Sequence, residues 1–237
     1  KVNQKTNIRL SGSQTVIRPE LRELAALNIY DFELNASVQG NPSLKRTKIT
    51  NLDLRYELYP RAGETFSLGI FYKDFQNAIE ALFEPGIGGA STFNYQNAKK
   101  ATAFGAELEL RKKLDFADAL KNFTVQGNFS YIKSKVEDTV LKIDRPLQGQ
   151  SPYLVNIGVM YDLEKKGFNA TLLFNQIGYR IANVGKVEDG FPDIYERGRP
   201  VLDLQLAQKV LKRKGEIRLN IADLLNQTRY FYMNGGT

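Results

Sequence analysis

The stretch NLDLRYELYP, residues 51–60, decides the fold class because its apolar and polar side chains alternate strictly. Leu52, Leu54, Tyr56 and Leu58 occupy every second position, and polar or charged residues fill the gaps between them. Successive side chains of a β-strand point to opposite faces, so the pattern predicts a strand with one wholly apolar face. That face meets either a protein core or the hydrocarbon of a membrane, and the function of the protein depends on which.

The same alternation recurs along the chain and predicts nine strands. They are expected near residues 4–16, 48–59, 64–76, 98–112, 121–134, 150–163, 167–180, 199–210 and 215–222. Most of these segments are about 10 to 14 residues long, whereas strands of soluble proteins usually have about 5 or 6. A bilayer core requires about 9 to 11 tilted residues of a strand, so the lengths favour a membrane barrel over a soluble β-sandwich.

The connections between the expected strands alternate in length. Tight links are expected at residues 60–64, 164–167 and 211–215, a modest one near 113–121, and longer ones at 17–47, 77–97, 135–149 and 181–198. Aromatic residues lie near the tight links at Phe66, Phe123, Tyr161 and Phe168, and toward the long ones at Tyr72, Tyr131 and Tyr153. Short periplasmic turns, long extracellular loops and two aromatic belts are typical of outer-membrane barrels.

The alternation also assigns a face to each strand residue. The apolar positions are predicted to face lipid, and they are Leu52, Leu54, Leu58, Phe66, Leu68, Ile70, Leu108, Leu110, Val155, Ile157, Leu172, Leu204 and Leu219. The charged candidates for a wet barrel interior are Arg9, Asp53, Arg55, Glu57, Lys73, Glu107, Glu109, Arg111, Asp203, Glu216 and Arg218. Because a closed barrel satisfies all its backbone donors and acceptors, we predict an all-β, transmembrane antiparallel β-barrel.

The composition excludes most catalytic chemistry. The chain of 237 residues has no Cys and no His, which removes thiol nucleophiles, Ser-His-Asp triads and the commonest metal ligands. Glu107 and Glu109 lie about 7 Å apart on one strand face, and we interpret them as interior charges rather than as an acid–base pair. The sequence therefore predicts no enzyme, no catalytic residue, no cofactor and no metal site.

Charge and hydropathy bear on two further possibilities, nucleic-acid binding and a membrane-spanning helix. The 33 Lys and Arg against 26 Asp and Glu give a net charge of +7, but no recognition helix or basic arm predicts nucleic-acid binding. No apolar run approaches 18 residues, so no transmembrane helix is expected.

The long connections hold the remaining candidates. Ligand contact is considered for Asp144, Arg145, Gln148, Asp189, Asp193, Glu196 and Arg197, because loops carry recognition, although solvated loop charge is the simpler interpretation. The Gly-rich EPGIGGAS, residues 84–91, lacks the Lys-Ser/Thr pair of a phosphate loop, so a flexible external loop is expected there. One short helix is expected within residues 21–28.

Four segments resemble TonB-dependent outer-membrane receptors. The longest is GNPSLKRTKITNLDLRYELYPRAGETFSLGIFYKDFQNAIE at residues 40–80, where Asn41, Pro42 and Leu44 precede a strand with a polar face and a tight turn. VIRPELREL at 16–24 is similar to a segment of Bacteroidetes-type members. FNYQNAKKATAFGAELELRKKL at 93–114 and LNIADLLNQTRYFY at 219–232 resemble their late strands.

The resemblance implies a barrel of 22 strands filled by an N-terminal plug, which imports a scarce ligand with energy passed from the inner membrane. Residues 1–237 are then expected to be the C-terminal part of such a barrel, since they show about nine strands, no plug domain and no TonB-contacting box. The final MNGGT also lacks the usual closing strand with a terminal aromatic residue.

The same resemblance implies a location in the outer membrane of a Gram-negative bacterium. Its implied partners are outer-membrane lipid, the receptor's own plug and remaining strands, and TonB through the plug, with a surface lipoprotein as a further candidate. The ligand classes are siderophore, vitamin, peptide and glycan. Two alternatives stay open: a self-contained small barrel that acts as an anchor or adhesin, and a soluble β-rich binding module.

Overall fold

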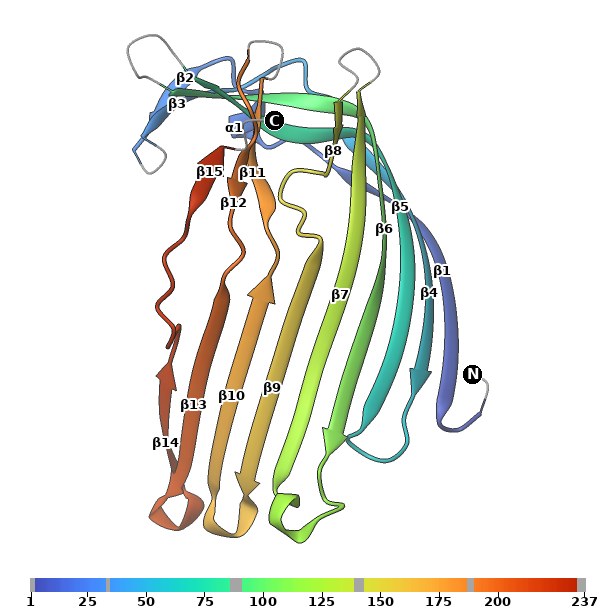
Figure 1. Ribbon diagram of the computed structural model, residues 1–237, viewed down its shortest axis with the longest axis vertical. Helices are drawn as coiled ribbons and strands as arrows, with labels where there is room; N and C mark the ends of the chain where they lie inside the picture. The colour runs from blue at the N-terminus through green and yellow to red at the C-terminus, as the bar shows by residue number, and fades with distance from the viewer. Residues whose placement is uncertain (1–2, 33–34, 86–90, 139–142, 187–189, 234–237) are drawn as a thin grey trace.

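Nine long strands follow one another in an antiparallel meander in the computed structural model, which describes residues 3–32, 35–85, 91–138, 143–186 and 190–233 (Figure 1). They are β1 (Thr6–Ile17), β4 (Thr47–Leu58), β5 (Thr65–Pro85), β6 (Ser91–Lys113), β7 (Phe123–Asp138), β9 (Tyr153–Leu163), β10 (Phe168–Ile177), β13 (Pro200–Val210) and β14 (Gly215–Ile221). Each pairs with the next, so they form one wall with β1 and β14 at its edges. Within the described ranges these two edges do not pair with each other, and the wall is an open arc.

The long strands overlap the nine ranges expected from alternation, but one expected connection is wrong. β5 and β6 continue far beyond residues 64–76 and 98–112, so most of the long connection expected at 77–97 is strand. The hairpin keeps one register from Thr65↔Arg111 to Pro85↔Ser91. Alternation misses this extension because the face that is buried there carries Ala78, Glu80 and Leu82, a small, a charged and an apolar residue, and so shows no apolar stripe.

The β5–β6 hairpin bends at Asn77. Asn77 has a φ of 56°, a left-handed conformation that Asn tolerates better than most residues, and the ladder lacks a pair at this position. The Asn77 carbonyl accepts hydrogen bonds from the Thr47 hydroxyl at 2.7 Å and the Asn97 side-chain amide at 2.9 Å. Beyond the bend, the hairpin runs across the upper end of the wall (Figure 1).

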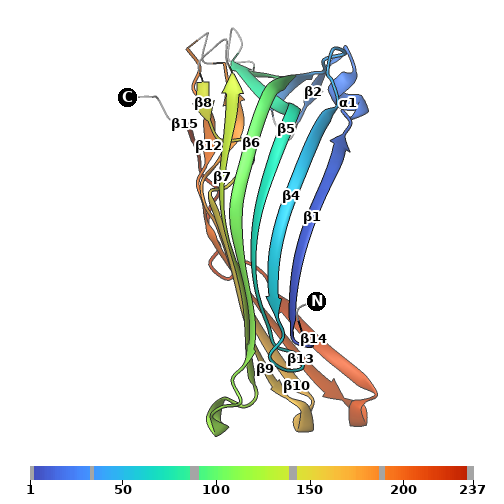
Figure 2. The same cartoon turned by 90° about the vertical axis from the view of Figure 1, so that its right-hand side faces the viewer.

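Short strands pair with the bent hairpin and continue the same 15-stranded sheet into an upper layer, which we call the cap. β11 (Arg180–Gly185) lies parallel to β5, and β3 (Ala36–Gln39) lies parallel to β6. β2 (Asn28–Asp31) pairs with β3, β12 (Ile194–Glu196) pairs with β11, and β15 (Phe231–Met233) pairs with β12. β8 (Ile143–Arg145) pairs with the end of β7. The expected short helix is α1 (Leu21–Leu24). Figure 2 shows the wall as a curved shell with α1 and β2 at its upper end.

The buried core lies in the cap rather than in the wall. Among the described residues, three small apolar clusters are centred on Ala101, Val38 and Ile181, and all three belong to the upper parts of the strands or to the cap. The long connections expected at 17–47, 135–149 and 181–198 are therefore partly ordered into this layer. Three tight turns and the longer connection at 114–122 lie at the opposite end, at the bottom of Figure 1.

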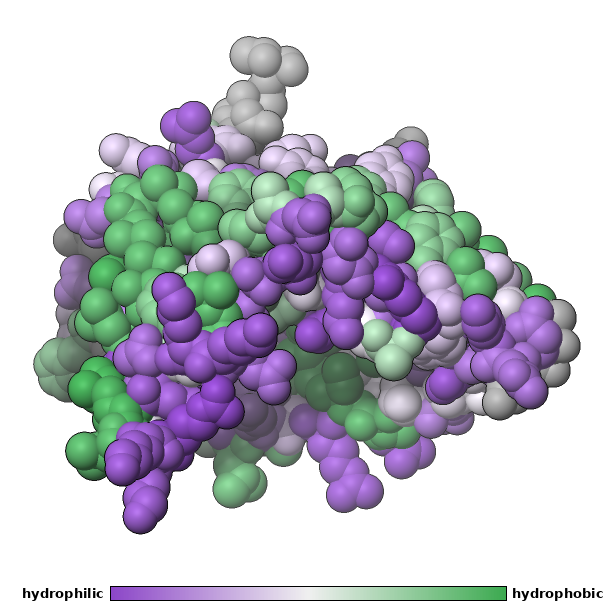
Figure 3. Space-filling model, turned by 90° about the horizontal axis from the view of Figure 1, so that it is seen from below, coloured by the Kyte–Doolittle hydropathy of each residue, from purple (hydrophilic) through white to green (hydrophobic). Residues whose placement is uncertain are grey.

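Register divides the wall into two faces. One apolar row runs Leu10, Leu54, Ile70, Ala106, Tyr131 and Tyr153, and the next runs Ile8, Tyr56, Leu68, Leu108, Phe129 and Val155. Paired residues share a face, so every predicted lipid-facing residue lies on this apolar face and every charged interior candidate on the other, polar face. Seen from below, apolar side chains follow the upper rim of the arc, which is its convex side (Figure 3).

Aromatic residues mark two levels on the apolar face. Phe123 pairs with Tyr161 near the tight turns, and Tyr131 pairs with Tyr153 toward the cap. The ring centroids of Phe123 and Tyr161 are 4.7 Å apart, and Phe168 lies 6.4 Å from Tyr161. Eight residue steps separate the levels in both strands, or roughly 27 Å along the strand. This is comparable to the apolar band of about 25 Å on outer-membrane barrels.

Candidate functional site

The polar face of the wall carries one connected ion network on its first strands. Glu57 lies between Arg9 and Arg55, with N···O distances of 3.1 and 3.3 Å. Arg55 also reaches Glu109 at 2.6 Å and donates a hydrogen bond to the Ser67 hydroxyl at 3.0 Å. The Glu57 side chain is only 6% exposed because these neighbours surround it. The network ties together β1, β4, β5 and β6.

Other charges on the polar face lack an oppositely charged partner in the described part of the chain. Glu107 and Lys73 take part in no ion pair there, and Lys73 lies 5.3 Å from the Phe71 ring centroid. Asp53 accepts only a long hydrogen bond of 3.5 Å from Ser11. Glu107 is exposed and Asp53 and Lys73 are half-exposed, so water can solvate these charges in the structure as it stands.

The last strands carry a second, smaller set of charges. Glu216 pairs with Arg218 at 2.6 Å within β14, and an Asp203 carboxylate oxygen accepts the Asp223 backbone N–H at 2.8 Å. Arg111 donates a hydrogen bond of 3.4 Å to Gln126 across to β7. The interior candidates therefore form two groups rather than one continuous site.

An amide ladder crosses the strands between these groups. Asn156 on β9 donates to the Asn128 side-chain oxygen on β7 at 2.6 Å, and Asn175 on β10 donates to the Asn156 side-chain oxygen. A hollow of about 630 Å³ lies over this part of the polar face and is bordered by Glu109 and Asp203. Alternation within one strand places each of these amides on the polar side, but only the register brings them into one ladder.

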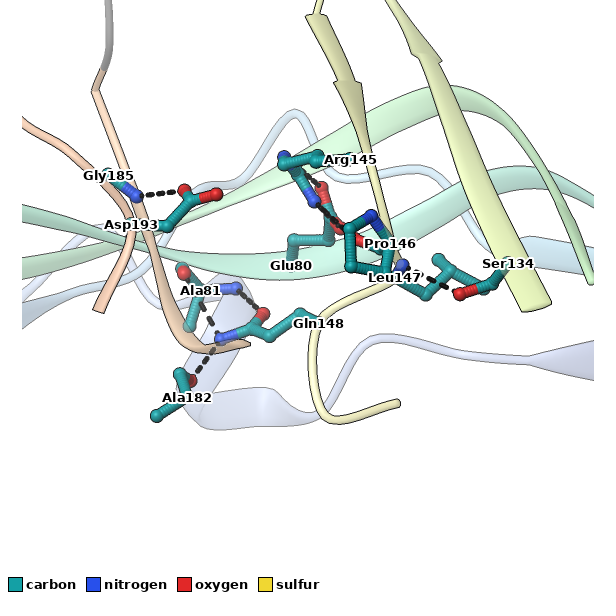
Figure 4. Close-up of polar contacts among 10 residues, drawn as sticks. All are labelled: Glu80, Ala81, Ser134, Arg145, Pro146, Leu147, Gln148, Ala182, Gly185 and Asp193. Atoms are coloured by element: carbon teal, nitrogen blue, oxygen red, sulfur yellow. Dashed lines mark hydrogen bonds and ion pairs between the residues drawn. The ribbon is translucent and has the colours of Figure 1, made fainter. Parts of the chain in front are cut away.

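Arg145 and Gln148 make a set of buried polar contacts with the bent hairpin and with β11, and we call this set the latch (Figure 4). Both guanidinium ends of Arg145 contact the Glu80 carboxylate, at 2.9 and 2.6 Å, and the two side chains are 10% and 1% exposed. Gln148 accepts the Ala81 N–H at 2.8 Å and donates to the Ala182 carbonyl at 2.8 Å. One short segment after β8 thus fastens β5 and β11 together.

The latch places three of the loop candidates, Arg145, Gln148 and Asp193, within one structural cluster. Burial alone lowers the pKa of Arg145, but the hydrogen bonds and charge of Glu80 reverse this and leave the pKa raised. Burial raises the pKa of Asp193, although its carboxylate accepts the Gly185 N–H at 2.9 Å. Glu80 was not foreseen, because nothing in a single strand marks an inward carboxylate as the partner of a distant arginine.

The cavity beside the latch does not resemble a ligand site. It has a volume of about 440 Å³, and its charged lining consists of Glu80, Arg180 and Glu196. Arg180 pairs with Glu196 at 2.6 Å, and Glu80 is held by Arg145. Its charged groups already have partners, so the geometry supports a structural role for Arg145, Gln148 and Glu196.

The other loop candidates are dispersed. Asp144 pairs with Lys135 at 3.0 Å on the exposed side of β7, and the Arg197 N–H donates to the Tyr230 carbonyl at 2.9 Å. Asp189, and residues 86–90 of the Gly-rich segment, lie outside the described residues. The residues that the structure describes contain no cluster able to hold a metal ion and no helix long and apolar enough to cross a membrane.

The tight-turn end holds a second ion network. Arg61 contacts Glu64 at 2.8 Å and also pairs with Asp115 of the next turn. Glu64 further accepts the Lys113 N–H at 3.2 Å and lies 3.2 Å from the Lys112 amine. The hydrogen bond from Arg61, followed by those from Lys112 and Lys113, lowers the pKa of Glu64 to about 2. Two neighbouring turns are thereby linked.

The sequence of the chain matches the model of a known protein family. The profile described as TonB dependent receptor-like, beta-barrel, matches residues 1–224, which is nearly the whole chain. The chain belongs to the TonB-dependent receptor family. The resemblance noted in the sequence is thus confirmed at the level of the family, whose members are outer-membrane transporters of Gram-negative bacteria, not enzymes.

Solved receptors share the fold of this TonB-dependent receptor chain. A mutant of the ferric enterobactin receptor PfeA from Pseudomonas aeruginosa matches with a TM-score of 0.65 and 14% identity, over 96% of this chain and 34% of that one. The siderophore receptor PirA from Acinetobacter baumannii gives 0.62 and 17%, over 96% and 36%. The copper transporter OprC gives 0.65 and 18%, over 95% and 32%.

This TonB-dependent receptor chain spans about a third of the length of those solved receptors. No curated protein sequence matches it. At these identities the solved structures establish the fold alone, and the family profile carries the classification.

Proposed function

We propose that this chain is the C-terminal part of a 22-stranded barrel in a Bacteroidetes-type TonB-dependent receptor, and that the intact receptor imports a scarce ligand. The observation that carries the proposal is the two-faced wall, with an apolar convex face between two aromatic levels and a charged concave face. The profile match and the share of the solved receptors that the chain covers support it. The alternatives of a self-contained anchor and a soluble module are not favoured by these matches.

In this proposal the apolar face meets outer-membrane lipid. Its side chains stay 39% to 74% exposed at Leu10, Ile70 and Leu172, although a water-soluble protein would bury such rows. The tight turns then lie in the periplasm and the cap lies outside the cell, as in other outer-membrane barrels. The open edges β1 and β14 pair with the remaining strands of the receptor, since a spanning sheet cannot leave an edge in lipid.

The polar face then meets the plug domain, through which TonB acts in this family. Asp53, Lys73 and Glu107 supply unmatched charges for that contact. The ligand class stays among siderophore, vitamin, peptide and glycan. The printed names of the solved relatives, a ferric enterobactin receptor and a copper transporter, describe those proteins and support metal-carrying compounds as the first to try.

Two measurements on the intact receptor test the proposal. A fluorophore attached at Leu172→Cys should be strongly quenched by brominated phospholipids, and one at Thr171→Cys, which faces the other way, should not. Radiolabelled ferric enterobactin, copper, cobalamin and a peptide mixture then serve as uptake probes in cells with and without TonB. Equal quenching at both positions would refute the lipid-facing assignment, and uptake that is independent of TonB would refute the transport role.

A further inference from the structure

The turn between β9 and β10 lies beside the turn between β13 and β14. The two come together because β10 pairs with β13. The Arg213 guanidinium donates to the Glu164 carbonyl at 2.8 Å, and the Gln208 side-chain amide donates to the Lys166 carbonyl at 3.0 Å. The two turns therefore form one joined surface at the bottom of the wall (Figure 1).

This joined surface carries an unbalanced positive charge. Its cations are Lys165, Lys166, Lys212, Arg213 and Lys214, all of them exposed, and we call these five side chains the basic patch. Glu164 is the one carboxylate that the two turns contain. Within the described part of the chain, none of the four lysines takes part in an ion pair.

The other half of the tight-turn end is balanced. Arg61 contacts both Glu64 and Asp115. Lys121 lies 3.6 Å from Asp118. The positive charge of this end is thus concentrated at the turns of β9, β10, β13 and β14. A cluster of cations of this kind attracts an anionic partner, because the field of neighbouring like charges adds up.

An apolar side chain accompanies the basic patch on the membrane side. Leu211 is 77% exposed. A Cβ at Gly215 would lie 3.7 Å from the Leu211 side chain and 3.3 Å from that of Val210. Gly215 is two positions before Ile217 and shares its apolar face, since strand side chains alternate with a period of two. Leu211 therefore extends the apolar face of the wall beyond the end of β13.

The basic patch begins where the lower aromatic level ends. Phe168 is the second residue after Lys166, and Tyr161 lies three residues before Glu164. Aromatic rings at such a level lie among the lipid headgroups. Two or three strand residues add roughly 7 to 10 Å, and a Lys side chain extends its ammonium group toward a polar boundary. The four ammonium groups can therefore reach the phosphates of the adjoining leaflet.

We propose that the basic patch binds the headgroups of anionic phospholipids in the periplasmic leaflet. The inference rests on the proposed function, because it requires the wall to span the membrane with its tight turns in the periplasm. The ammonium groups attract the net negative headgroup, while Leu211 enters the boundary between headgroups and acyl chains. A soluble anionic polymer would match the charge but leave Leu211 in water, so the apolar contact favours a lipid.

The experiment measures which lipids lie next to the basic patch, on the intact receptor in phosphatidylcholine vesicles. A bimane fluorophore is attached at Ala170→Cys, near the patch, or at Leu110→Cys, near the balanced half. This chain has no cysteine, and any elsewhere in the receptor is replaced. The two positions are matched, because Ala170 pairs with Tyr161 and Leu110 pairs with Phe66. A small fraction of phosphatidylglycerol or phosphatidylcholine with brominated acyl chains is the quencher.

We expect brominated phosphatidylglycerol to quench the fluorophore at Ala170→Cys about fivefold more effectively than brominated phosphatidylcholine. A single cation near an anionic membrane surface already favours association by that factor. The test variant combines Lys165→Gln, Lys166→Gln, Lys212→Gln and Lys214→Gln. It keeps Arg213, which joins the two turns, and the two lipids should then quench equally. The matched control is Lys121→Gln, which removes a cation that has its own partner and should leave the preference unchanged.

A second measurement needs no altered patch. Raising the salt concentration from 0.1 to 1 M shortens the screening length from about 10 to about 3 Å. The preference for phosphatidylglycerol at Ala170→Cys should therefore fall with salt, and a preference that is independent of salt contradicts the proposal.

The outcomes separate the headgroup site from the proposed function. Equal quenching by the two lipids at Ala170→Cys, the same preference at Leu110→Cys, or a preference that survives in the test variant overturns headgroup binding and leaves the membrane-spanning wall in place. Loss of the preference on adding soluble peptidoglycan fragments at constant ionic strength assigns the patch to that polymer and also overturns the proposal. If neither lipid quenches either position, the apolar face does not meet lipid, and the proposed function fails together with the inference.

Discussion

Removing one partner of the buried Glu80–Arg145 pair should loosen the whole cap. Two oppositely charged groups about 4 Å apart attract by roughly 4 kcal/mol at an effective dielectric constant of about 20. Arg145→Met leaves the Glu80 carboxylate, which is 1% exposed, without its counter-charge. The expected cost is about 3–5 kcal/mol, as for other buried pairs that lose one member.

The assay is amide hydrogen exchange of the intact receptor, followed by mass spectrometry on peptides from the cap ends of β5 and β8. A loss of about 3–5 kcal/mol in local opening free energy corresponds to exchange that is roughly a hundredfold to several thousandfold faster. The matched control is Lys135→Met, which removes a pair of similar distance, 3.0 Å, whose members are 49% and 71% exposed. That control should cost about 1 kcal/mol or less.

A second variant separates a lost ion pair from a lost shape. Glu80→Met combined with Arg145→Met removes both charges, and replacing a buried pair by apolar side chains is often neutral or stabilising. The double variant should therefore recover most of the protection lost in Arg145→Met. If Arg145→Met exchanges no faster than Lys135→Met, the pair does not hold the cap, and the reasoning about its burial is wrong.

Three further predictions concern the wall and its turns. Leu172→Arg should cost about 2–4 kcal/mol near the bilayer midplane, and Thr171→Arg on the other face much less, as measured by denaturation in lipid vesicles. Gly105→Ala should cost about 1–3 kcal/mol because the new Cβ would lie 2.5 Å from a backbone oxygen and 2.7 Å from a Phe ring. Gly69→Ala, whose nearest atom is 3.9 Å away, should leave the denaturation midpoint unchanged. The pKa of Glu64 is lowered from 4.5 to about 2 by its Arg and Lys partners, so its stabilising effect is present above pH 4.5 and lost as the pH falls toward 2. The difference in melting temperature between the wild type and Glu64→Gln should vanish over that interval, and a difference that persists at pH 2 would contradict the assignment.

The cap shows why part of the fold was not predictable. The bend at Asn77 depends on hydrogen bonds from Thr47 and Asn97, and the latch joins Arg145 to a carboxylate 65 positions away in the chain. Short strands such as β3 and β11 have too few residues to show a period of two. Their pairing is decided by the hairpin that they lie against, and that hairpin is itself displaced by the bend.

The amide ladder illustrates the same limit within the wall. Alternation can assign Asn128, Asn156 and Asn175 to the polar side of their own strands, but their register is set by turn geometry and by the whole pairing of neighbouring strands. The basic patch likewise needs the pairing of β10 with β13, because that pairing brings its two turns together.

By itself, the sequence determined that Leu54 and Arg55 point to opposite sides of a long strand, because side-chain direction in a strand is fixed locally by its period of two. For the same reason it determined which side of each wall strand is apolar, and where the tight turns fall. Only the tertiary structure decided which charges meet, which stay unmatched, and how the cap is fastened, because those contacts join residues whose separation along the chain carries no local signal.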